Sequence, residues 1–466
     1  MKKEFTSYEE FVESKNYTIE PSGFVTDEIN PYLFDYQKAI VKWALRKGKA
    51  ALFEDTGLGK TIQQLAFADA VNKHTNKPVL ILAPLAVAEQ TSRESEKFGM
   101  KCKVCESQAD VINGINITNY EKIHKFDTDI FSGIVLDESS IIKSYSGKTT
   151  NDLQERFRNT PYKLCCTATP SPNDYTEIGT TAEFLGVMTR SEMLSMFFIN
   201  DCIKKGNNQR LGWRLKGHAR KEFFKWISSW AMMIKNPKDL GFDGTRFDLP
   251  KLNINEIVIE NEQPEETLFV EYAETLTERR QARKESAELR IEKAKEIVES
   301  LKENEQCLLW CDYNYESEML HKAINGSVEV KGSDDVEHKK KSMIGFANGD
   351  VRLLVSKSSI CGFGMNWQGC NNMIFVGLSD SYESFYQAIR RCWRFGQEKE
   401  VNVYVIISEK EMNVLNNIKR KQDEHETMSK EMIAIMSESA INEINNYEIK
   451  KTDYKPSVEF SLPSWL

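Results

Sequence analysis

The chain has 466 residues, of which 40% are hydrophobic and 28% charged, and its formal net charge is −8. This balance excludes disordered, fibrous and collagen-like proteins, and the length is that of two large domains or about three of ordinary size. The negative charge also excludes a uniformly basic nucleic-acid binder, although a binding surface needs only a local basic stripe.

The beginning of the chain and its cysteines predict a cytoplasmic protein. The first 20 residues are charged and lack the apolar core of a signal peptide. No apolar run is long enough to span a bilayer, so we expect no membrane contact. Of the ten cysteines, only Cys102 and Cys105 have metal-like spacing, and no second pair follows them. We therefore expect no zinc site and mostly buried, reduced thiols.

Residues 49–73 read as a strand, a glycine loop and a helix, which is the order of a phosphate-binding loop. The loop EDTGLGKT matches the consensus G-x-x-x-x-G-K-[ST], except that Glu54 replaces the first glycine. Glycines let backbone N–H groups turn toward phosphate oxygens, and the helix N-terminus adds positive partial charge. Lys60 is expected to reach the β- and γ-phosphates, and the Thr61 hydroxyl to hold Mg²⁺. The expected nucleotide-binding residues of the loop are Thr56, Gly57, Leu58, Gly59, Lys60 and Thr61.

An acidic pair follows the apolar run 133–136 in the segment SGIVLDESS. Such a run predicts a strand, and ligands bind at the carboxyl ends of parallel strands. Asp137 is expected to hold Mg²⁺ through water, and Glu138 to orient and deprotonate the attacking water. The plainer alternative is a turn whose acids cap a helix, but the position downstream of a phosphate loop favours the catalytic interpretation.

The segment QAIRRCWRFGQ, residues 387–397, places Arg391 and Arg394 three apart, one helical turn. They are either a solvated basic face or cations that reach a phosphate held elsewhere in the chain. The upstream phosphate loop favours the second interpretation, because guanidinium groups are planar, always charged and able to bind phosphate bidentately.

In their order, these motifs resemble the superfamily 2 helicases and translocases, most closely the Swi/Snf-type motors. In length and layout the chain is similar to the compact versions encoded by bacteriophages. The resemblance covers residues 32–405, most of the chain. It implies two tandem RecA-like α/β domains, ATP and Mg²⁺ as cofactors, and a nucleic-acid partner, with DNA expected first.

In the first half, YLFDYQKAIVKW resembles the Q-motif, in which Gln37 would read the adenine. EDTGLGKT resembles motif I, where the missing first glycine is normal for the family. LILAPLAVAEQ and INITNYEKI resemble motifs Ia and Ib, and TATP resembles motif III. DESS stands at motif II, where Ser139 and Ser140 depart from the usual box and leave the coupling contacts open. The implied nucleic-acid and coupling residues are Pro84, Thr118, Thr167, Thr169 and Asn366.

In the second half, CLLWCDYN resembles motif IV, and SICGFGMNWQGCNNMIFVG resembles motif V, with Gly364 implied at the nucleotide. QAIRRCWRFGQ resembles motif VI and implies catalytic roles for Gln387, Arg391 and Arg394. Arg394 would be the arginine finger, with Arg391 beside it on the γ-phosphate; such fingers are worth roughly 10³–10⁵ in rate. Arg390 replaces a frequent small residue and is expected to face solvent or a nucleic-acid phosphate.

We expect a first domain over residues 1–250, with a helical insertion at about 191–250, a second domain over 251–440 and a tail over 441–466. A charged helical stretch at 265–306 leads into the second domain, and helix follows residue 407. The expected strands are 52–53, 79–83, 115–118, 134–137 and 163–167 in the first domain, and 307–311, 327–331, 352–356, 373–376 and 402–407 in the second.

Two surfaces keep alternative interpretations. Residues 201–250 carry eleven basic and five acidic side chains, which form either a solvated surface or a site for nucleic-acid phosphates. In the same segment, Phe223, Trp226, Ile227 and Trp230 have helical spacing and are expected in the core rather than on a stacking surface. Trp367, in motif V, fits either a core position or a contact with the track.

The sequence thus predicts an ATP-dependent nucleic-acid motor, a DNA helicase or translocase, with phage replication or recombination proteins as partners in the host cytoplasm. The alternatives are an RNA helicase, a scaffold with an inactive ATPase, and the motor subunit of a restriction or defence complex. No appended nuclease or methyltransferase motif is visible, so that last role would require partners. Polarity, preference for single or double strands, and oligomeric state stay open.

Overall fold

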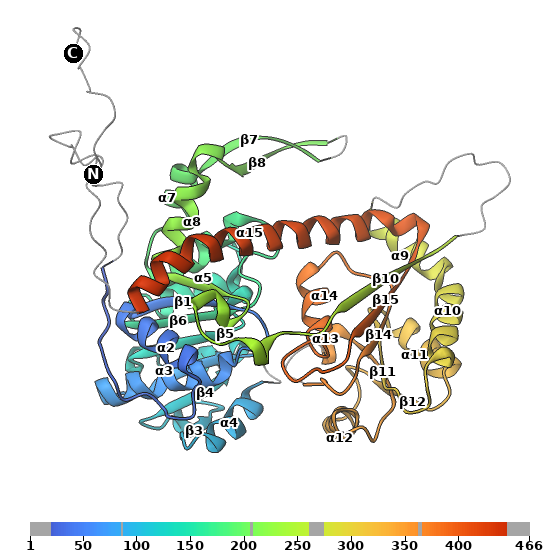
Figure 1. Cartoon of the computed structure of the whole chain (residues 1–466), viewed down its shortest axis with the longest axis horizontal. Helices are drawn as coiled ribbons and strands as arrows, with labels where there is room; N and C mark the ends of the chain where they lie inside the picture. Colours follow the sequence, from blue (N-terminus) through green and yellow to red (C-terminus); the bar gives the residue numbers. More distant parts are fainter. Residues whose placement is uncertain (1–19, 85–86, 206–207, 261–274, 362–365, 445–466) are drawn as a thin grey trace, which may run out of the picture.

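The computed structural model describes residues 20–84, 87–205, 208–260, 275–361 and 366–444. It consists of two α/β domains side by side, with one long helix, α15, lying across both of them (Figure 1). Each domain is built on its own parallel sheet with flanking helices, so the expected tandem RecA-like architecture is confirmed.

The first domain contains a sheet of seven parallel strands in the order β3-β4-β2-β5-β6-β1-β9. The central strands are continuous apolar runs because helices cover both of their faces. The five strands expected here are confirmed. The strands are β1 (Lys49–Glu54), β2 (Val79–Ala83), β3 (Cys102–Val104), β4 (Ile115–Asn119), β5 (Gly133–Asp137), β6 (Tyr162–Thr167) and β9 (Ala231–Ile234). The helices are α2 (Asp35–Lys47), α3 (Lys60–Thr75), α4 (Ala88–Lys97), α5 (Lys148–Arg156) and α6 (Ile178–Leu185).

The second domain contains six parallel strands in the order β10-β15-β14-β11-β13-β12, with apolar clusters on both faces. All five strands expected here are confirmed. The strands are β10 (Leu252–Ile259), β11 (Cys307–Cys311), β12 (Ser327–Val330), β13 (Leu353–Lys357), β14 (Asn372–Val376) and β15 (Val401–Ser408). The helices are α9 (Leu276–Glu285), α10 (Ala287–Ser300), α11 (Asn314–Ala323), α12 (Val336–Asn348), α13 (Ser358–Cys361) and α14 (Tyr382–Ile389).

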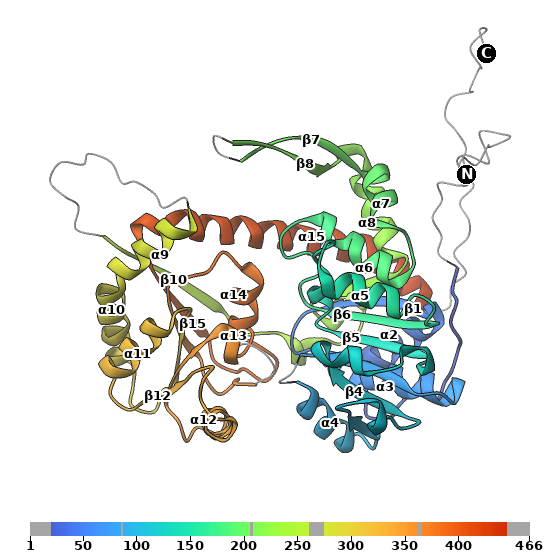
Figure 2. The same ribbon diagram turned by 180° about the vertical axis from the view of Figure 1, so that it is seen from behind.

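The insertion expected to be helical is only partly so. In the sequence, helices α7 (Arg190–Phe197) and α8 (Arg220–Ser228) flank an antiparallel hairpin of β7 (Phe198–Lys205) and β8 (Asn208–Leu215). The strand β9 then joins the edge of the first sheet beside β1. The prediction of helix was wrong for the hairpin because its two strands stabilise each other by pairing. It was wrong for β9 because an apolar run of four residues is too short to show a helical or strand period. Figure 2 shows the hairpin extending away from the first domain.

Aromatic side chains of the insertion form a core, as expected. Phe223, Ile227 and Trp230 are fully buried and Trp226 nearly so. The rings of Phe223 and Trp226 lie 5.9 Å apart, and those of Trp226 and Trp230 lie 5.4 Å apart. These side chains are therefore unavailable for base stacking. Trp367 also lies in the core, packed against Phe346 with ring centroids 5.4 Å apart.

The helix α15 (Met412–Ile444) follows β15 in the second domain and returns to the first. Met428 and Met432 belong to the apolar core of the first domain. Glu431 pairs with Arg220 of α8 at 2.8 Å, and His425 Nε2 lies 3.3 Å from the carbonyl oxygen of Ala168, in motif III. The expected C-terminal helix is confirmed. The chain first crosses from one domain to the other near residue 250, and this helix is the second connection between them.

Among the described cysteines, Cys102 is half-buried and seven others are buried with free thiols, which confirms the expected burial. Within the described ranges, no helix is long and apolar enough to cross a membrane. The expected tail lies largely outside the described residues, which end at 444.

Candidate nucleotide-binding site

The glycine loop lies between the end of β1 and the first turn of α3. Gly57 and Gly59 have φ angles of 93° and 79°, which side-chain-bearing residues rarely adopt. A Cβ on Gly59 would lie 2.4 Å from Gln37 Nε2, and a Cβ on Gly57 would lie 2.9 Å from the backbone nitrogen of Phe395. Both glycines are therefore required by backbone conformation and by space.

Lys60 begins α3 and folds back over the loop. Its Nζ donates hydrogen bonds to the carbonyl oxygens of Glu54, at 2.7 Å, and of Asp55, at 3.2 Å. The Thr56 hydroxyl is buried and, within the described residues, has no hydrogen-bond partner. Buried polar groups are nearly always paired, so this hydroxyl and the Lys60 ammonium group beside it fit a polar ligand such as a phosphate.

The two predicted acids lie at the end of β5, which is separated from β1 in the sheet by the strand β6. Gln64 donates to Asp137 Oδ1 at 2.7 Å, and the Thr167 hydroxyl donates to Glu138 Oε1 at 2.7 Å. Burial raises the pKa of both carboxyl groups, and the nearby Lys60 opposes that rise. The structure thus brings together the predicted lysine, both acids and Thr167.

Glu138 has a φ of 55°, and Asn76 is the only other described non-glycine residue with a positive φ. A left-handed conformation is costly for a residue other than glycine and often occurs at functional sites. Here it carries the side chain of Glu138 toward Thr167, away from the line of the strand.

Glu54 is a buried acid of the loop that sequence reasoning missed, because it was treated only as a replacement for glycine. Its side chain is 1% exposed, and Gln63 Nε2 donates to its Oε2 at 2.8 Å. Burial raises the pKa of Glu54 to about 7, while Lys60 and the Gln63 hydrogen bond act in the opposite direction. The available signal was an acidic residue at the end of an apolar strand, where a carboxyl group is desolvated.

These residues fit ATP and Mg²⁺. The glycine cradle, the α3 N-terminus and Lys60 suit a triphosphate, and the oxygens of Thr61 and Asp137 are ligands that Mg²⁺ prefers. Gln37 joins the glycine loop to the start of α2: its Nε2 donates to the carbonyl oxygen of Leu58 at 2.9 Å, and its Oε1 accepts from Phe34 N at 3.0 Å. Its role at the adenine stays a prediction.

Motif VI of the second domain lies against the glycine loop. Gln387 is buried, and its Oε1 accepts a hydrogen bond from Arg391 Nη2 at 3.4 Å. Arg394 is half-buried, and within the described ranges its side chain forms no hydrogen bond or ion pair. Burial lowers the pKa of Arg394. A desolvated guanidinium without a partner fits the arginine finger predicted from the sequence.

Arg390 was expected at a surface, and this expectation was wrong. Its side chain is 3% exposed and forms an ion pair with Asp55 of the glycine loop. The Tyr386 hydroxyl donates to the same carboxylate. Arg390 faces inward because Asp55, partly buried at the domain boundary, needs a compensating charge.

The predicted coupling residues lie in different environments. Pro84 follows β2 and is half-buried, whereas Thr118 and Thr169 are buried, and their hydroxyl groups have no partner among the described residues. Asn366 is exposed, and Gly364 lies outside the described residues. Contacts of these residues with a nucleic acid stay predictions.

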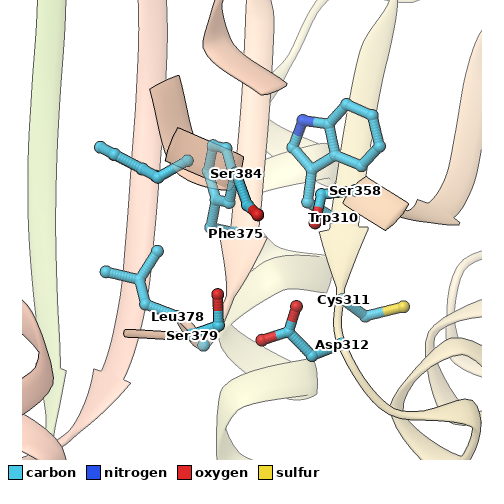
Figure 3. Close-up of a pocket in the computed structure, with 10 residues that line it drawn as sticks. Trp310, Cys311, Asp312, Ser358, Phe375, Leu378, Ser379 and Ser384 are labelled. Atoms are coloured by element: carbon cyan, nitrogen blue, oxygen red, sulfur yellow. The ribbon is translucent and has the colours of Figure 1, made fainter. Parts of the chain in front are cut away.

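A small pocket lies at the carboxyl ends of β11 and β14 in the second domain. Figure 3 shows the side chains of Asp312, Ser379 and Ser384 around it, with Trp310 and Phe375 forming a wall. Its volume of about 10 Å³ is room for about one water molecule. It is too small for a second nucleotide.

A groove of about 1020 Å³ separates the β7–β8 hairpin from α15. Its walls come from the insertion, from the loop after β6 and from α15. The groove is therefore lined both by the first domain and by the helix that follows the second domain. The basic lining residues are Arg214, Arg220, Lys419, Arg420 and Lys421, and the acidic ones are Asp174, Asp423 and Glu424.

Comparisons with known proteins agree with this geometry. Residues 36–308 match the family described as SNF2-related domain, and residues 290–396 match the helicase conserved C-terminal domain. A putative ATP-dependent helicase/translocase, YwqA of Bacillus subtilis, is 23% identical over 92% of this chain and 52% of its own length. A SWI/SNF-related, actin-dependent regulator of chromatin, subfamily A-like protein 1, of Drosophila melanogaster is 21% identical over 86% of this chain and 57% of its own length. The chain thus spans about half the length of these relatives.

One solved structure, the Sulfolobus solfataricus SWI2/SNF2 ATPase core in complex with dsDNA, covers 89% of this chain and 97% of its own. The sequence identity is 22% and the TM-score is 0.41. A superposition this loose does not transfer residue positions or domain placement.

Proposed function

The chain belongs to the SNF2-related family, and from that premise we propose that it is an ATP-hydrolysing motor that moves along DNA or unwinds it. One observation carries the proposal: the glycine loop of the first domain, whose Lys60 lies near both acids, is joined to motif VI of the second domain by the ion pair of Asp55 with Arg390. Hydrolysis at such a boundary depends on how the domains are placed, which is what a motor requires.

In the proposed reaction, Lys60 exchanges the carbonyl oxygens of its own loop for the β- and γ-phosphates. Thr61, and Asp137 through water, would hold Mg²⁺, which when bound would neutralise charge on the phosphates. Glu138 accepts a proton from the attacking water, and its raised pKa makes it a stronger base than an exposed carboxylate. The Thr167 hydroxyl fixes the direction of that carboxylate.

Arg391 and Arg394 complete the site from the second domain. Arg394 stabilises the charge that develops on the transferred phosphoryl group, and Gln387 orients Arg391. Because these groups come from the other domain, ATP favours the arrangement that brings them close. Release of phosphate removes that preference, and each cycle can therefore shift one domain relative to the other along a bound strand.

The track is proposed to be DNA, bound across both domains and reaching the groove between the hairpin and α15. The basic side chains of that groove suit phosphates, and those at 201–250 include Arg214 and Arg220. The chain's length and motif layout resemble compact phage enzymes, which supports a role in phage DNA replication or recombination in a bacterial cytoplasm. The assay below distinguishes an RNA track from a DNA track. A role in a restriction or defence complex would be shown by co-purification with partner proteins.

The test is the steady-state ATPase rate without polymer and with single-stranded DNA, duplex DNA or RNA of matched sequence. Salt is held fixed and low, because phosphate contacts make affinity steeply salt-dependent. Stimulation by DNA supports the proposal. Stimulation by RNA alone would replace DNA as the track, and an absence of hydrolysis under every condition would refute the motor and favour a scaffold.

A further inference from the structure

Asp55 connects the glycine loop directly to the second domain. Its carboxylate pairs with Arg390 and accepts a hydrogen bond from the Tyr386 hydroxyl. On its own side of the boundary, Asp55 Oδ1 accepts from Thr56 N at 2.7 Å, and the Asp55 carbonyl oxygen accepts from Lys60 Nζ at 3.2 Å. One residue therefore contacts the loop backbone, the phosphate-binding lysine and motif VI.

Arg390 is held rigidly on the other side. Its Nη1 donates to the carbonyl oxygen of Trp393 at 3.1 Å, and its guanidinium lies 4.4 Å from the ring centroid of Trp393 and 5.3 Å from that of Tyr386. Trp393 Nε1 in turn donates to the carbonyl oxygen of Pro250, where the chain crosses between the domains, at 2.7 Å. Both partners of the ion pair are thus held in place by further contacts with backbone atoms of their own domains.

The position of Arg390 determines what this contact can do. It immediately precedes Arg391 in the chain, and Arg394 follows four residues later, in the turns after the end of α14. Phe395 extends the same contact, because its backbone nitrogen packs against Gly57 and its ring lies 4.9 Å from that of Phe247. Fixing Arg390 against Asp55 therefore fixes where Arg391 and Arg394 stand relative to the phosphate loop.

We propose that Asp55, Tyr386 and Arg390 form a positioning contact that places the motif VI arginines at the γ-phosphate of ATP. The inference rests on the proposed ATPase function. None of the three needs to touch the nucleotide, so they are positioning residues and not catalytic ones. A displacement of about 1 Å at a reacting centre can cost about 100-fold in rate, so their loss is expected to lower kcat while ATP still binds.

The test compares four variants with the wild-type chain under DNA-stimulated conditions: Asp55→Asn, Arg390→Gln, the double variant and Arg390→Lys. Asp55→Asn keeps the oxygen that accepts from Thr56 N, so the loop itself is preserved. Glu285→Gln is the matched control, since it removes the ion pair with Lys410 at 3.3 Å within the second domain and touches neither the glycine loop nor the groove. Each variant is first checked for an unchanged circular dichroism spectrum and thermal midpoint.

We expect each single substitution to lower kcat by about 10- to 100-fold with less than a threefold change in KM. The double variant should be no slower than the slower single variant, because both remove the same contact. Arg390→Lys should recover part of kcat, and Glu285→Gln should stay within twofold of wild type.

Three results would overturn the inference: an unchanged kcat, an increase in kcat from release of an inhibitory contact, or independent losses that multiply in the double variant. Failure of the proposed function is distinguished from these by the wild-type chain. If the wild type hydrolyses ATP and Lys60→Ala does not, the ATPase stands and only the positioning role has failed.

Discussion

Replacing Glu54 by Gln is predicted to make the protein more stable at high pH. The carboxyl group is 1% exposed, and burial raises its pKa from 4.5 to about 7. The folded state therefore binds the proton more tightly than the unfolded state does. The stability that this proton supplies is fully present below pH 4.5, the unfolded value, and is lost as the pH rises through about 7.

The size of the effect follows from the shift. One pKa unit corresponds to 1.36 kcal/mol, so the wild-type chain should lose about 2–3 kcal/mol of unfolding free energy between pH 5 and pH 8.5 because of this group. Glutamine is neutral throughout and keeps nearly the same shape. The difference in stability between Glu54→Gln and wild type should therefore grow by that amount over the same range.

Urea unfolding of both proteins at half-unit pH intervals measures this difference. All other titrating groups are the same in the two proteins, so their contributions cancel when one unfolding free energy is subtracted from the other. The unfolding is followed by tryptophan fluorescence, with the denaturant slope checked for equality between the two proteins. Parallel stability curves from pH 5 to 8.5 would refute the reasoning, since they would show that Glu54 is ionised in the folded protein without a penalty.

Three further substitutions test other parts of the account. Lys60→Ala should abolish hydrolysis in a steady-state assay while the thermal midpoint stays close to wild type; retained turnover would rule out the phosphate-loop assignment. Arg394→Ala should bind a fluorescent ATP analogue normally and hydrolyse ATP about 10³-fold more slowly or worse, whereas an unchanged rate would mean that the finger is another residue. Phe223→Ala should cost about 3–5 kcal/mol of stability, as for other fully buried phenylalanines, and a loss below 1 kcal/mol in urea unfolding would show that the insertion does not share the core of the first domain.

Most of the strands and the whole phosphate loop could be predicted from the sequence, because their signals are local. A strand buried on both faces is a continuous apolar run, and the loop needs glycine at fixed offsets before the lysine. The two acids at the end of β5 and the arginines of motif VI were readable for the same reason. Each stands at a set distance from a recognisable element, and the tandem fold brings the elements together.

The features that sequence analysis missed depend on pairing partners and not on the local pattern of one segment. The strand β10 is an edge strand whose partner, β15, lies about 150 residues later, and the hairpin β7–β8 forms by pairing between its own two segments. Arg390 faces inward only because Asp55, more than 300 residues earlier, lies opposite it. No local pattern carries that information. The raised pKa of Glu54 results from burial in the folded protein, and its only local signal was its place at the end of an apolar strand.

Movement along DNA is the central claim, and displacement of a third strand from a DNA triplex measures it most directly. The protein is loaded on a duplex that carries a labelled triplex-forming oligonucleotide, ATP is added, and release of the label is followed with time. We predict release by the wild-type chain, dependent on ATP and on duplex length on the loading side, and none by Lys60→Ala. DNA-stimulated hydrolysis without any release of the oligonucleotide would contradict the account, because it would show an ATPase that binds DNA and does not move on it.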